Sequence, residues 1–391
     1  MTTTQDLGQY FTTNTELKQK VLEFVLNEPQ LILEPSVGQG DLVQIIHSTY
    51  PHISFDMYEI DPTISLLSDI PTNVTYCNFL DKDISTRYNT IIGNPPFVRT
   101  TTGNLYIDFI RKCFQLLQPN GELIFIIPSD FFKLTSASIL LDTMMQNGSF
   151  THIYHPHKEN LFTNASIDVL IFRYCKTVSL ENKVFYNNET VFLRNQQGLI
   201  TFHKELSMNT IMIKDSFDIY VGIVSGRDKI YKHKEFGNIT VLNGLNKTDN
   251  YIFLETFPSK NIPLNNYLLS HKQELLNRKI KKFNEKNWFE WGAPRNIKKI
   301  NEHWGKDCIY ICNLTRQSIV AFKGKVQYFG GGLLILIPRN KIQLEPIINY
   351  LNSPEFKQNF LFSGRFKIGH RQISNSLISQ SLIVPTNQTP S

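Results

Sequence analysis

The segment Asn94-Pro95-Pro96-Phe97 contains the residues whose types most directly specify a reaction. Two consecutive prolines fix the backbone and remove two amide donors. Two acceptors remain at fixed positions: the side-chain oxygen of Asn94 and the carbonyl of Pro95. A planar amino group on a conjugated ring is a poor nucleophile because its lone pair is delocalised. Two fixed acceptors for its hydrogens favour a tetrahedral nitrogen, while Phe97 offers a face for stacking. The segment therefore predicts chemistry at a ring amine, with a proline-stiffened turn as the alternative.

A second group of residues suggests a ligand that contains adenosine. Two glycines in the turn Glu34–Gly40 (EPSVGQG) let the backbone approach a ligand closely, although the turn matches neither GxGxxG nor a P-loop. Nineteen residues after Gly40, Glu59 can accept hydrogen bonds from both ribose hydroxyls. Asn78 can bond an adenine edge and Phe79 can stack on the ring. A turn without a ligand, a surface carboxylate and ordinary loop packing remain the alternatives.

These residues need a scaffold that brings them together, and the first half predicts one. Apolar runs that read as strands alternate with helical patterns, which is typical of a parallel α/β sheet. The predicted strands are 31–33, 55–60, 74–77, 90–92, 123–127, 150–154 and 168–174. Helices are expected around Leu17, Val21 and Val25, opened by a capping box from Thr13 to Glu16, around Leu42, Ile45 and Ile46, and over 105–117. The polar segments follow the strands, so they meet at the carboxyl edge of the sheet.

The second half predicts a separate domain with a different charge. Residues 1–175 hold 10 basic and 18 acidic side chains, a net −8, whereas the remaining 30 and 16 give +14. Strand-like runs at 217–224, 308–312 and 333–337 are interleaved with Asn, Lys and Gly, so we expect a mixed α+β domain and a boundary near residue 212. The basic half favours an anionic polymer as partner. A solvated lysine-rich surface is the alternative.

Several segments of this half are suited to nucleic acid. The run 278–282 (RKIKK) suits phosphates. The segments 364–367 (GRFK) and 369–372 (GHRQ) hold Arg and Gln, which read guanine and adenine bidentately. The segment 288–295 (WFEWGAPR) has aromatic residues and a basic end, but its tryptophans also suit a hydrophobic core. We expect DNA binding from the region as a whole and assign no single residue.

The order GQYFT, EPSVGQG, YEID, NFLD and NPPF, followed by a basic region, resembles the gamma class of S-adenosylmethionine-dependent DNA adenine-N6 methyltransferases. The resemblance is strong over residues 7–175 and diffuse beyond. It implies a Rossmann-like class I methyltransferase sheet of seven strands with flanking helices over residues 1–212, and a DNA target-recognition domain over 213–391. It also implies a cofactor site made by Tyr10, Thr12, Glu34, Ser36, Gly38, Gly40, Glu59, Ile60, Asn78, Phe79 and Asn94.

The same resemblance implies a catalytic segment of Asn94, Pro95, Pro96 and Phe97, with Phe97 and Phe162 stacking on the target base. Two positions depart from the family pattern: many relatives have Asp where this chain has Asn78, and the commoner residue at Phe97 is Tyr. An amide oxygen still accepts a hydrogen bond, and a phenyl ring still stacks. The implied reaction is direct attack of N6 on the sulfonium methyl, after the adenine has been extruded from the duplex at a cost of about a few kcal/mol.

The implied partners are double-stranded DNA and a restriction endonuclease that acts independently, in a restriction–modification system; we expect a monomer and no metal. A cytosine-C5 methyltransferase would need a nucleophilic cysteine, usually after Pro, and none of the five cysteines follows Pro. A protein-glutamine or RNA methyltransferase with the same NPP-aromatic motif remains an alternative, as does a non-catalytic DNA-binding module. Relatives of the former usually lack a large basic domain after the catalytic one.

Composition excludes other classes. The 391 residues are 41% hydrophobic and 19% charged, so they can bury a sizeable core. Five cysteines without a CxxC pair do not form a disulfide scaffold and favour a reducing compartment. No run approaches about 18 apolar residues, and the start MTTTQDLGQYFTT has no signal-peptide pattern. We therefore expect a cytoplasmic protein.

Overall fold

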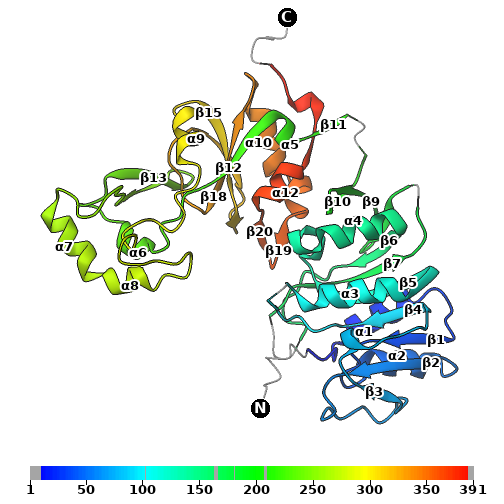
Figure 1. The fold of residues 1–391 in the computed structure, drawn as a ribbon. Helices are drawn as coiled ribbons and strands as arrows, with labels where there is room; N and C mark the ends of the chain where they lie inside the picture. The colour runs from blue at the N-terminus through cyan, green and yellow to red at the C-terminus, as the bar shows by residue number, and fades with distance from the viewer. Residues whose placement is uncertain (1–9, 102, 163–165, 180, 207–208, 386–391) are drawn as a thin grey trace, which may run out of the picture. The chain divides into compact units, whose positions relative to one another are not determined.

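The computed structural model describes residues 10–101, 103–162, 166–179, 181–206 and 209–385 (Figure 1). The chain divides into two compact units, one of Met1–Leu206 with Phe362–Gly364 and one of Ser207–Leu361 with Arg365–Ser391. Each unit buries clusters of apolar side chains of its own.

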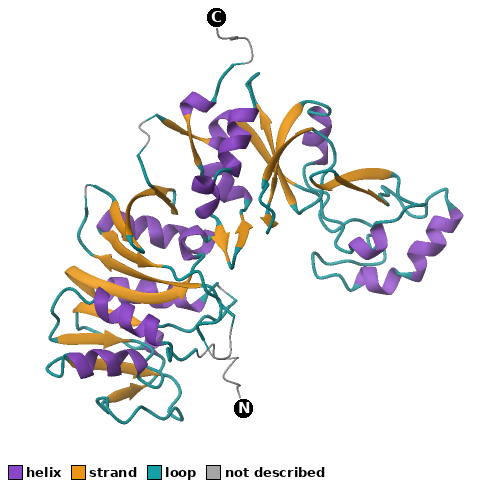
Figure 2. Cartoon of the chain, turned by 180° about the vertical axis from the view of Figure 1, so that it is seen from behind, coloured by secondary structure: helices purple, strands orange, loops and turns teal. Residues whose placement is uncertain are grey.

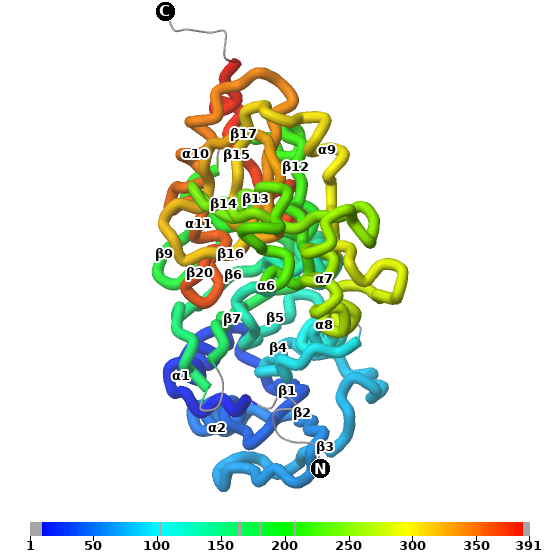
Figure 3. The backbone as a smooth tube through the Cα atoms, turned by 90° about the vertical axis from the view of Figure 1, so that its left-hand side faces the viewer, coloured from blue at the N-terminus to red at the C-terminus, as the bar shows by residue number. Residues whose placement is uncertain are grey.

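A ten-stranded sheet forms the centre of the first unit, in the order β10-β9-β8-β6-β7-β5-β4-β1-β2-β3. The strands are β1 (Leu31–Glu34), β2 (Ser54–Glu59), β3 (Val74–Tyr76), β4 (Tyr88–Gly93), β5 (Leu117–Pro128), β6 (Ser149–Tyr154), β7 (Val169–Cys175), β8 (Lys183–Tyr186), β9 (Glu189–Gln196) and β10 (Leu199–His203). Strands β3, β2, β1, β4 and β5 pair in parallel, and β7 is antiparallel to both β5 and β6. Figure 3 labels β5, β4, β1, β2 and β3 in this spatial order.

Helices cover both faces of this sheet (Figure 2). They are α1 (Thr15–Phe24), α2 (Asp41–Thr49), α3 (Leu105–Leu116) and α4 (Ser138–Asn147), with the short 3-10 turns η1 (Phe79–Asp81), η2 (Phe131–Lys133) and η3 (Thr135–Ala137). Successive residues of a strand point to opposite faces. Ile124 and Ile126 of β5 accordingly pack with α1 and α2, whereas Phe125 and Ile127 pack with α3 and α4.

The predicted strands and helices of the first half are confirmed, most of them to within two residues. β5 begins at Leu117, six residues before its predicted start, and α4 was not predicted. The N-cap of α1 is Asn14, whose side-chain oxygen accepts from the Leu17 amide at 3.1 Å, so the predicted capping box from Thr13 to Glu16 is wrong. Val25 is the C-cap rather than a helical residue. The predicted seven strands are present, and β8 to β10 extend the sheet beyond β6, with β8 parallel to it.

The second unit is a mixed α+β structure, as the sequence predicts. Its largest sheet has the order β12-β18-β15-β17 and is antiparallel throughout. The strands are β11 (Thr210–Met212), β12 (Phe217–Val221), β13 (Ile239–Gly244), β14 (Lys247–Tyr251), β15 (Asp307–Cys312), β16 (Leu314–Thr315), β17 (Ala321–Lys325), β18 (Leu333–Pro338), β19 (Leu361–Phe362), β20 (Arg365–Lys367) and β21 (Leu377–Ser379). The helices are α5 (Ile213–Ser216), α6 (Asp228–Tyr231), α7 (Ile262–Ser270), α8 (Lys272–Leu276), α9 (Ile297–Glu302), α10 (Glu345–Asn352), α11 (Pro354–Gln358), α12 (His370–Asn375) and the turn η4 (Gln380–Leu382).

Two segments of this unit that were candidates for nucleic-acid contact each contribute buried side chains to its core. Trp288 and Trp291 are buried. Arg278 is buried as well, and its guanidinium donates to the carbonyls of Leu275, Ser225 and Trp288 at 2.6–2.9 Å. The run 278–282 suits phosphates as a group, but the Arg278 donors are already bonded to backbone acceptors. Among the described residues, no helix combines the length and the apolar character that a membrane crossing requires.

Candidate active site

A cavity of about 180 Å³ lies at the carboxyl ends of β1, β2, β3 and β4. The predicted site residues that line it are Tyr10, Ser36, Gly38, Glu59, Ile60, Asn78, Phe79, Asn94 and Pro96. Thr12, Glu34, Gly40, Pro95, Phe97 and Phe162 are not among its lining residues. Pro95 is buried, and the other five are placed below. Predicted site residues from five separate segments of the chain therefore line one cavity.

The turn after β1 has the conformation that its glycines allow. Gly38 has φ +55° and Gly40 has φ +91°, which other residues rarely adopt. A Cβ on Gly38 would lie 3.2 Å from the ring of Phe11, and a Cβ on Gly40 would lie 2.2 Å from Cδ1 of Ile70. Gly38 thus brings backbone close to the cavity, while Gly40 caps α2 and packs against Ile70 away from it.

Glu34 lies behind the cavity wall. Its side chain is buried, and Oε1 accepts from the Ser36 amide at 3.2 Å. Burial raises the pKa of Glu34 to about 8, with a smaller contribution from the nearby charge of Glu59. The Glu34 side chain therefore supports the turn by accepting from the turn's backbone, and it is protonated over much of the neutral pH range.

The Glu59 carboxylate lines the cavity and already accepts three backbone hydrogen bonds. Oε2 accepts from the Gly38 amide at 2.9 Å, and Oε1 accepts from the amides of Ile60 at 2.8 Å and Asp61 at 3.0 Å. A carboxylate has about four acceptor positions, so Oε2 has capacity for one more donor. Glu59 thereby ties the turn after β1 to the end of β2 and keeps an acceptor position for a ligand hydroxyl.

The segment after β3 contributes one exposed and one buried side chain. Asn78 caps η1: its Oδ1 accepts from the Leu80 amide at 3.2 Å, and its Nδ2 donates to Asp81 at 2.6 Å. Phe79 is buried against Phe109, with ring centroids 5.6 Å apart and an angle of 23° between the ring planes. Phe79 is therefore part of the cavity wall that also belongs to the hydrophobic core.

The Asn94 amide is oriented by the N-terminal segment. Its Nδ2 donates to the Tyr10 carbonyl at 2.6 Å and to Oγ1 of Thr12 at 3.0 Å. A backbone carbonyl only accepts, so this bond fixes which end of the amide is nitrogen. The opposite atom, Oδ1, is buried and has no hydrogen-bond partner in the described structure. An unpaired buried acceptor costs about 1–3 kcal/mol, and this one belongs to a residue that lines the cavity.

Aromatic rings gather around Phe97, the last residue of the motif. The Tyr10 ring stacks on it at 5.7 Å and 28°, and the Phe162 ring meets it at 6.1 Å and 77°. Phe162, from the segment between β6 and β7, is itself buried. The predicted stacking pair is thus brought together, and in this structure the ring stacked on Phe97 is that of Tyr10.

Some lining residues were not assigned to the site individually, although Phe11, Pro35 and Leu80 lie in its predicted segments; the full set is Phe11, Pro35, Ile64, Cys77, Leu80, Leu105 and Phe109. Leu105 and Phe109 are four residues apart on α3, and that spacing is the one signal in the sequence that places them on a common helix face. Gly8 and Gln9, which belong to the GQYFT segment, lie outside the described residues.

The family that matches this chain covers a stretch of the first unit, which also holds the cavity. The family described as Eco57I restriction-modification methylase matches residues 72–162. The chain is 31% identical over 199 residues to the type II methyltransferase M.HincII of Haemophilus influenzae, covering 45% of this chain and 38% of that protein. It is 27% identical over 233 residues to the type II methyltransferase M.MjaIV of Methanocaldococcus jannaschii, covering 50% and 77%. The chain thus spans under half the length of M.HincII.

Among solved structures, the fold resembles that of the type IIL restriction-modification enzyme MmeI in complex with DNA. The TM-score is 0.58 at 11% sequence identity, over 92% of this chain and 63% of that chain. This likeness concerns the fold alone. The fold is α/β with a large central sheet, as predicted, and over part of its length the chain is similar in sequence to methyltransferases of restriction–modification systems.

Proposed function

We propose that this protein transfers the methyl group of S-adenosylmethionine to the N6 amino group of a flipped-out adenine at a specific site in double-stranded DNA, as part of a restriction–modification system. Residues 1–212 are proposed as the cofactor-binding and catalytic domain and 213–391 as the target-recognition domain. The choice of adenine rests on the resemblance of the NPPF segment to the gamma class. The observation that carries the proposal is the unpartnered Oδ1 of Asn94.

The residues around the cavity fit S-adenosylmethionine. Glu59 keeps an acceptor position for a ribose hydroxyl, Ile60 and Phe79 provide apolar walls, and the turn at Gly38 permits close approach of backbone. When bound, the donor supplies an electrophilic methyl group on a sulfonium. In this proposal Tyr10 and Thr12 contribute to the site by holding the Asn94 amide and, for Tyr10, by lining the cavity.

The chain's own residues act on the amine in this scheme. Asn94 Oδ1 and the Pro95 carbonyl accept the two N–H groups of the amine, which concentrates its lone pair on nitrogen. Phe97 and Phe162 hold the base plane. A base that stacks on the face of Phe97 now covered by Tyr10 has to displace that ring. Stacking, at about 1–3 kcal/mol per base, offsets part of the cost of extrusion.

The test is methyl transfer from radiolabelled S-adenosylmethionine to DNA, RNA and protein acceptors, with digestion of labelled DNA to nucleosides. We expect label on DNA, as N6-methyldeoxyadenosine. Label as N4-methyldeoxycytidine would leave the mechanism standing and overturn the choice of base. Label on RNA or protein alone would support the alternative substrates. DNA binding without any transfer would identify a non-catalytic module. Modification-sensitive sequencing of DNA from expressing cells gives the target site.

A further inference from the structure

Tyr106 has a buried hydroxyl without a partner, and its ring packs against Phe97 of the proposed catalytic segment. It lies in the first turn of α3, and its side chain is 2% exposed. Its ring meets the ring of Phe97 edge to face, with centroids 6.1 Å apart and planes at 87°. No hydrogen-bond partner for this hydroxyl exists among the described residues.

A buried hydroxyl without a partner lowers stability, and filling the core does not require one. A phenylalanine fills nearly the same space without leaving a donor and acceptor unpaired. In the described part of the first unit, three buried side-chain atoms lack partners: His47 Nδ1, Asn94 Oδ1 and the Tyr106 hydroxyl. Two of the three therefore adjoin Phe97, one within its motif and one on the ring packed against it.

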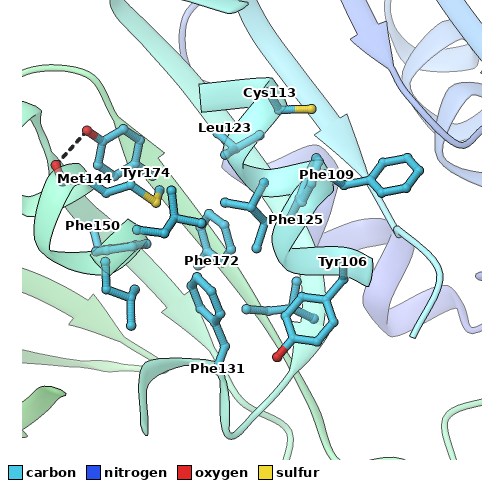
Figure 4. Close-up of a cluster of buried hydrophobic side chains, with 14 of the residues drawn as sticks. Tyr106, Phe109, Cys113, Leu123, Phe125, Phe131, Met144, Phe150, Phe172 and Tyr174 are labelled. Atoms are coloured by element: carbon cyan, nitrogen blue, oxygen red, sulfur yellow. Dashed lines mark hydrogen bonds between the residues drawn. The ribbon is translucent and has the colours of Figure 1, made fainter. Parts of the chain in front are cut away.

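Tyr174 shows what a satisfied hydroxyl looks like in the same core (Figure 4). It is fully buried, and its hydroxyl donates to the Met144 carbonyl at 2.8 Å. Both tyrosines belong to one apolar cluster. Their difference in partnering therefore does not follow from a difference in burial.

We propose that the Tyr106 hydroxyl donates a hydrogen bond to a ring nitrogen of the extruded base, which makes Tyr106 a specificity-determining residue. This inference rests on the proposed function. Adenine carries acceptors at N1 and N7 on either side of its amino group, so a donor beside an amine-gripping pair distinguishes it from rings without such an acceptor. Burial, together with the nearby charge of Asp130, raises the pKa of Tyr106, so the phenol stays protonated and able to donate.

The first experiment compares Tyr106→Phe with Tyr174→Phe on DNA that contains the target site. Tyr106→Phe should lower kcat/KM about threefold to tenfold, the effect of one neutral hydrogen bond, without lowering the melting temperature. Tyr174→Phe should lower the melting temperature, because the Met144 carbonyl loses its donor, and should leave kcat/KM unchanged. Unchanged kcat/KM in Tyr106→Phe, or a loss explained by a lower melting temperature, would overturn the inference.

The second experiment identifies the acceptor with target sites that carry 1-deazaadenine or 7-deazaadenine. On the analogue that lacks the bonded nitrogen, wild type and Tyr106→Phe should have equal kcat/KM; on the other analogue the difference should persist. A difference that persists on both analogues contradicts a bond to either nitrogen. If wild type transfers no methyl group to DNA at all, the proposed function fails and the inference with it, whereas failure confined to Tyr106→Phe refutes the inference alone.

Discussion

At the scale of single residues, the site depends on polar side chains that backbone hydrogen bonds hold in place and that keep an acceptor position open. Glu59 accepts three backbone hydrogen bonds, whereas Asn94 has a bonded nitrogen and an unbonded oxygen. A bonded nitrogen fixes the direction in which the free oxygen points. The Asn94 side chain is therefore oriented before any substrate arrives, which is a condition for stabilising charge that develops in a transition state.

Asn94→Ala should lower kcat by at least about a hundredfold, in the range seen when one preorganised polar group is removed from an active site. DNA affinity should stay within about twofold, because the change removes no charge. Single-turnover methyl transfer and fluorescence anisotropy measure the two quantities. Asn104→Ala is the matched control, because the Asn104 side chain makes no capping hydrogen bond to α3. Normal turnover in Asn94→Ala would remove the role assigned to this residue.

The stability of the first unit should depend on pH through Glu34. Its pKa is about 8 in the folded protein, against an ordinary value of 4.5 for a glutamate, so the unfolded chain releases a proton that the folded chain retains. Unfolding then becomes easier as pH rises from about 5 to about 8, by up to about 1.4 kcal/mol per pH unit. Glu34→Gln should remove this component. Urea melts of both proteins at several pH values test it, and parallel slopes would contradict it.

At the scale of elements, one buried carboxylate connects β4, β5 and β7 with the segment that follows α1. Glu122 of β5 accepts from the amides of Leu26 and Asn27, from Thr90 of β4 and from the Arg173 guanidinium of β7 at 2.7 Å. Both charged groups of the pair are buried. Removing one partner leaves an uncompensated charge in the interior, which costs more than the pair itself contributes.

Glu122→Ala should accordingly destabilise the protein by about 3–5 kcal/mol. Glu23→Ala, which removes the exposed pair with Lys20, should change stability by less than about 1 kcal/mol. The free energy of unfolding in urea gives both values. A loss of similar size in the two variants would show that the buried network contributes no more than a surface pair.

The sequence predicted these elements where their apolar pattern is strong. β1, β2, β4 and β7 are runs of buried residues bounded by turns, so their existence and order could be predicted. β8 and β9 were not predicted, because few of their residues are buried and their apolar runs are short. The edge strand β10 was not predicted either. The N-cap of α1 was misplaced by one residue because Thr13, Asn14 and Thr15 are adjacent candidates, and sequence does not distinguish which one adopts the cap conformation.

The site divides in the same way. The turn, Glu59 and Asn94 could be placed because each lies at or just after the end of a strand, whereas the orphan hydroxyl of Tyr106 could not, because an unsatisfied atom is defined by three-dimensional surroundings.

At the scale of the whole molecule, the charge asymmetry of the sequence was informative as a sum over many residues but not for single residues. The basic excess lies in residues 176–391, but the Arg278 guanidinium donates to backbone carbonyls inside the second unit.

Affinity for DNA should fall steeply with salt, and the residues of the run 278–282 should contribute unequally. Lys279 and Lys282 are exposed, whereas Arg278 is buried. Lys279→Gln with Lys282→Gln should make the slope of log affinity against log salt shallower by up to about 2, roughly 0.9 for each lost phosphate contact. Arg278→Gln should instead lower the melting temperature. A change of salt slope with Arg278→Gln in a fully folded protein would contradict this division.

The hydrogen bonds from Asn94 to Tyr10 and Thr12 have a practical consequence for handling the protein. The acceptors that orient the Asn94 amide are the Tyr10 carbonyl and the Thr12 hydroxyl, which lie more than eighty residues away in the chain. A shortened variant that lacks these two residues would leave that amide free to turn. Its inactivity would then reflect the lost anchor rather than a cavity unable to act.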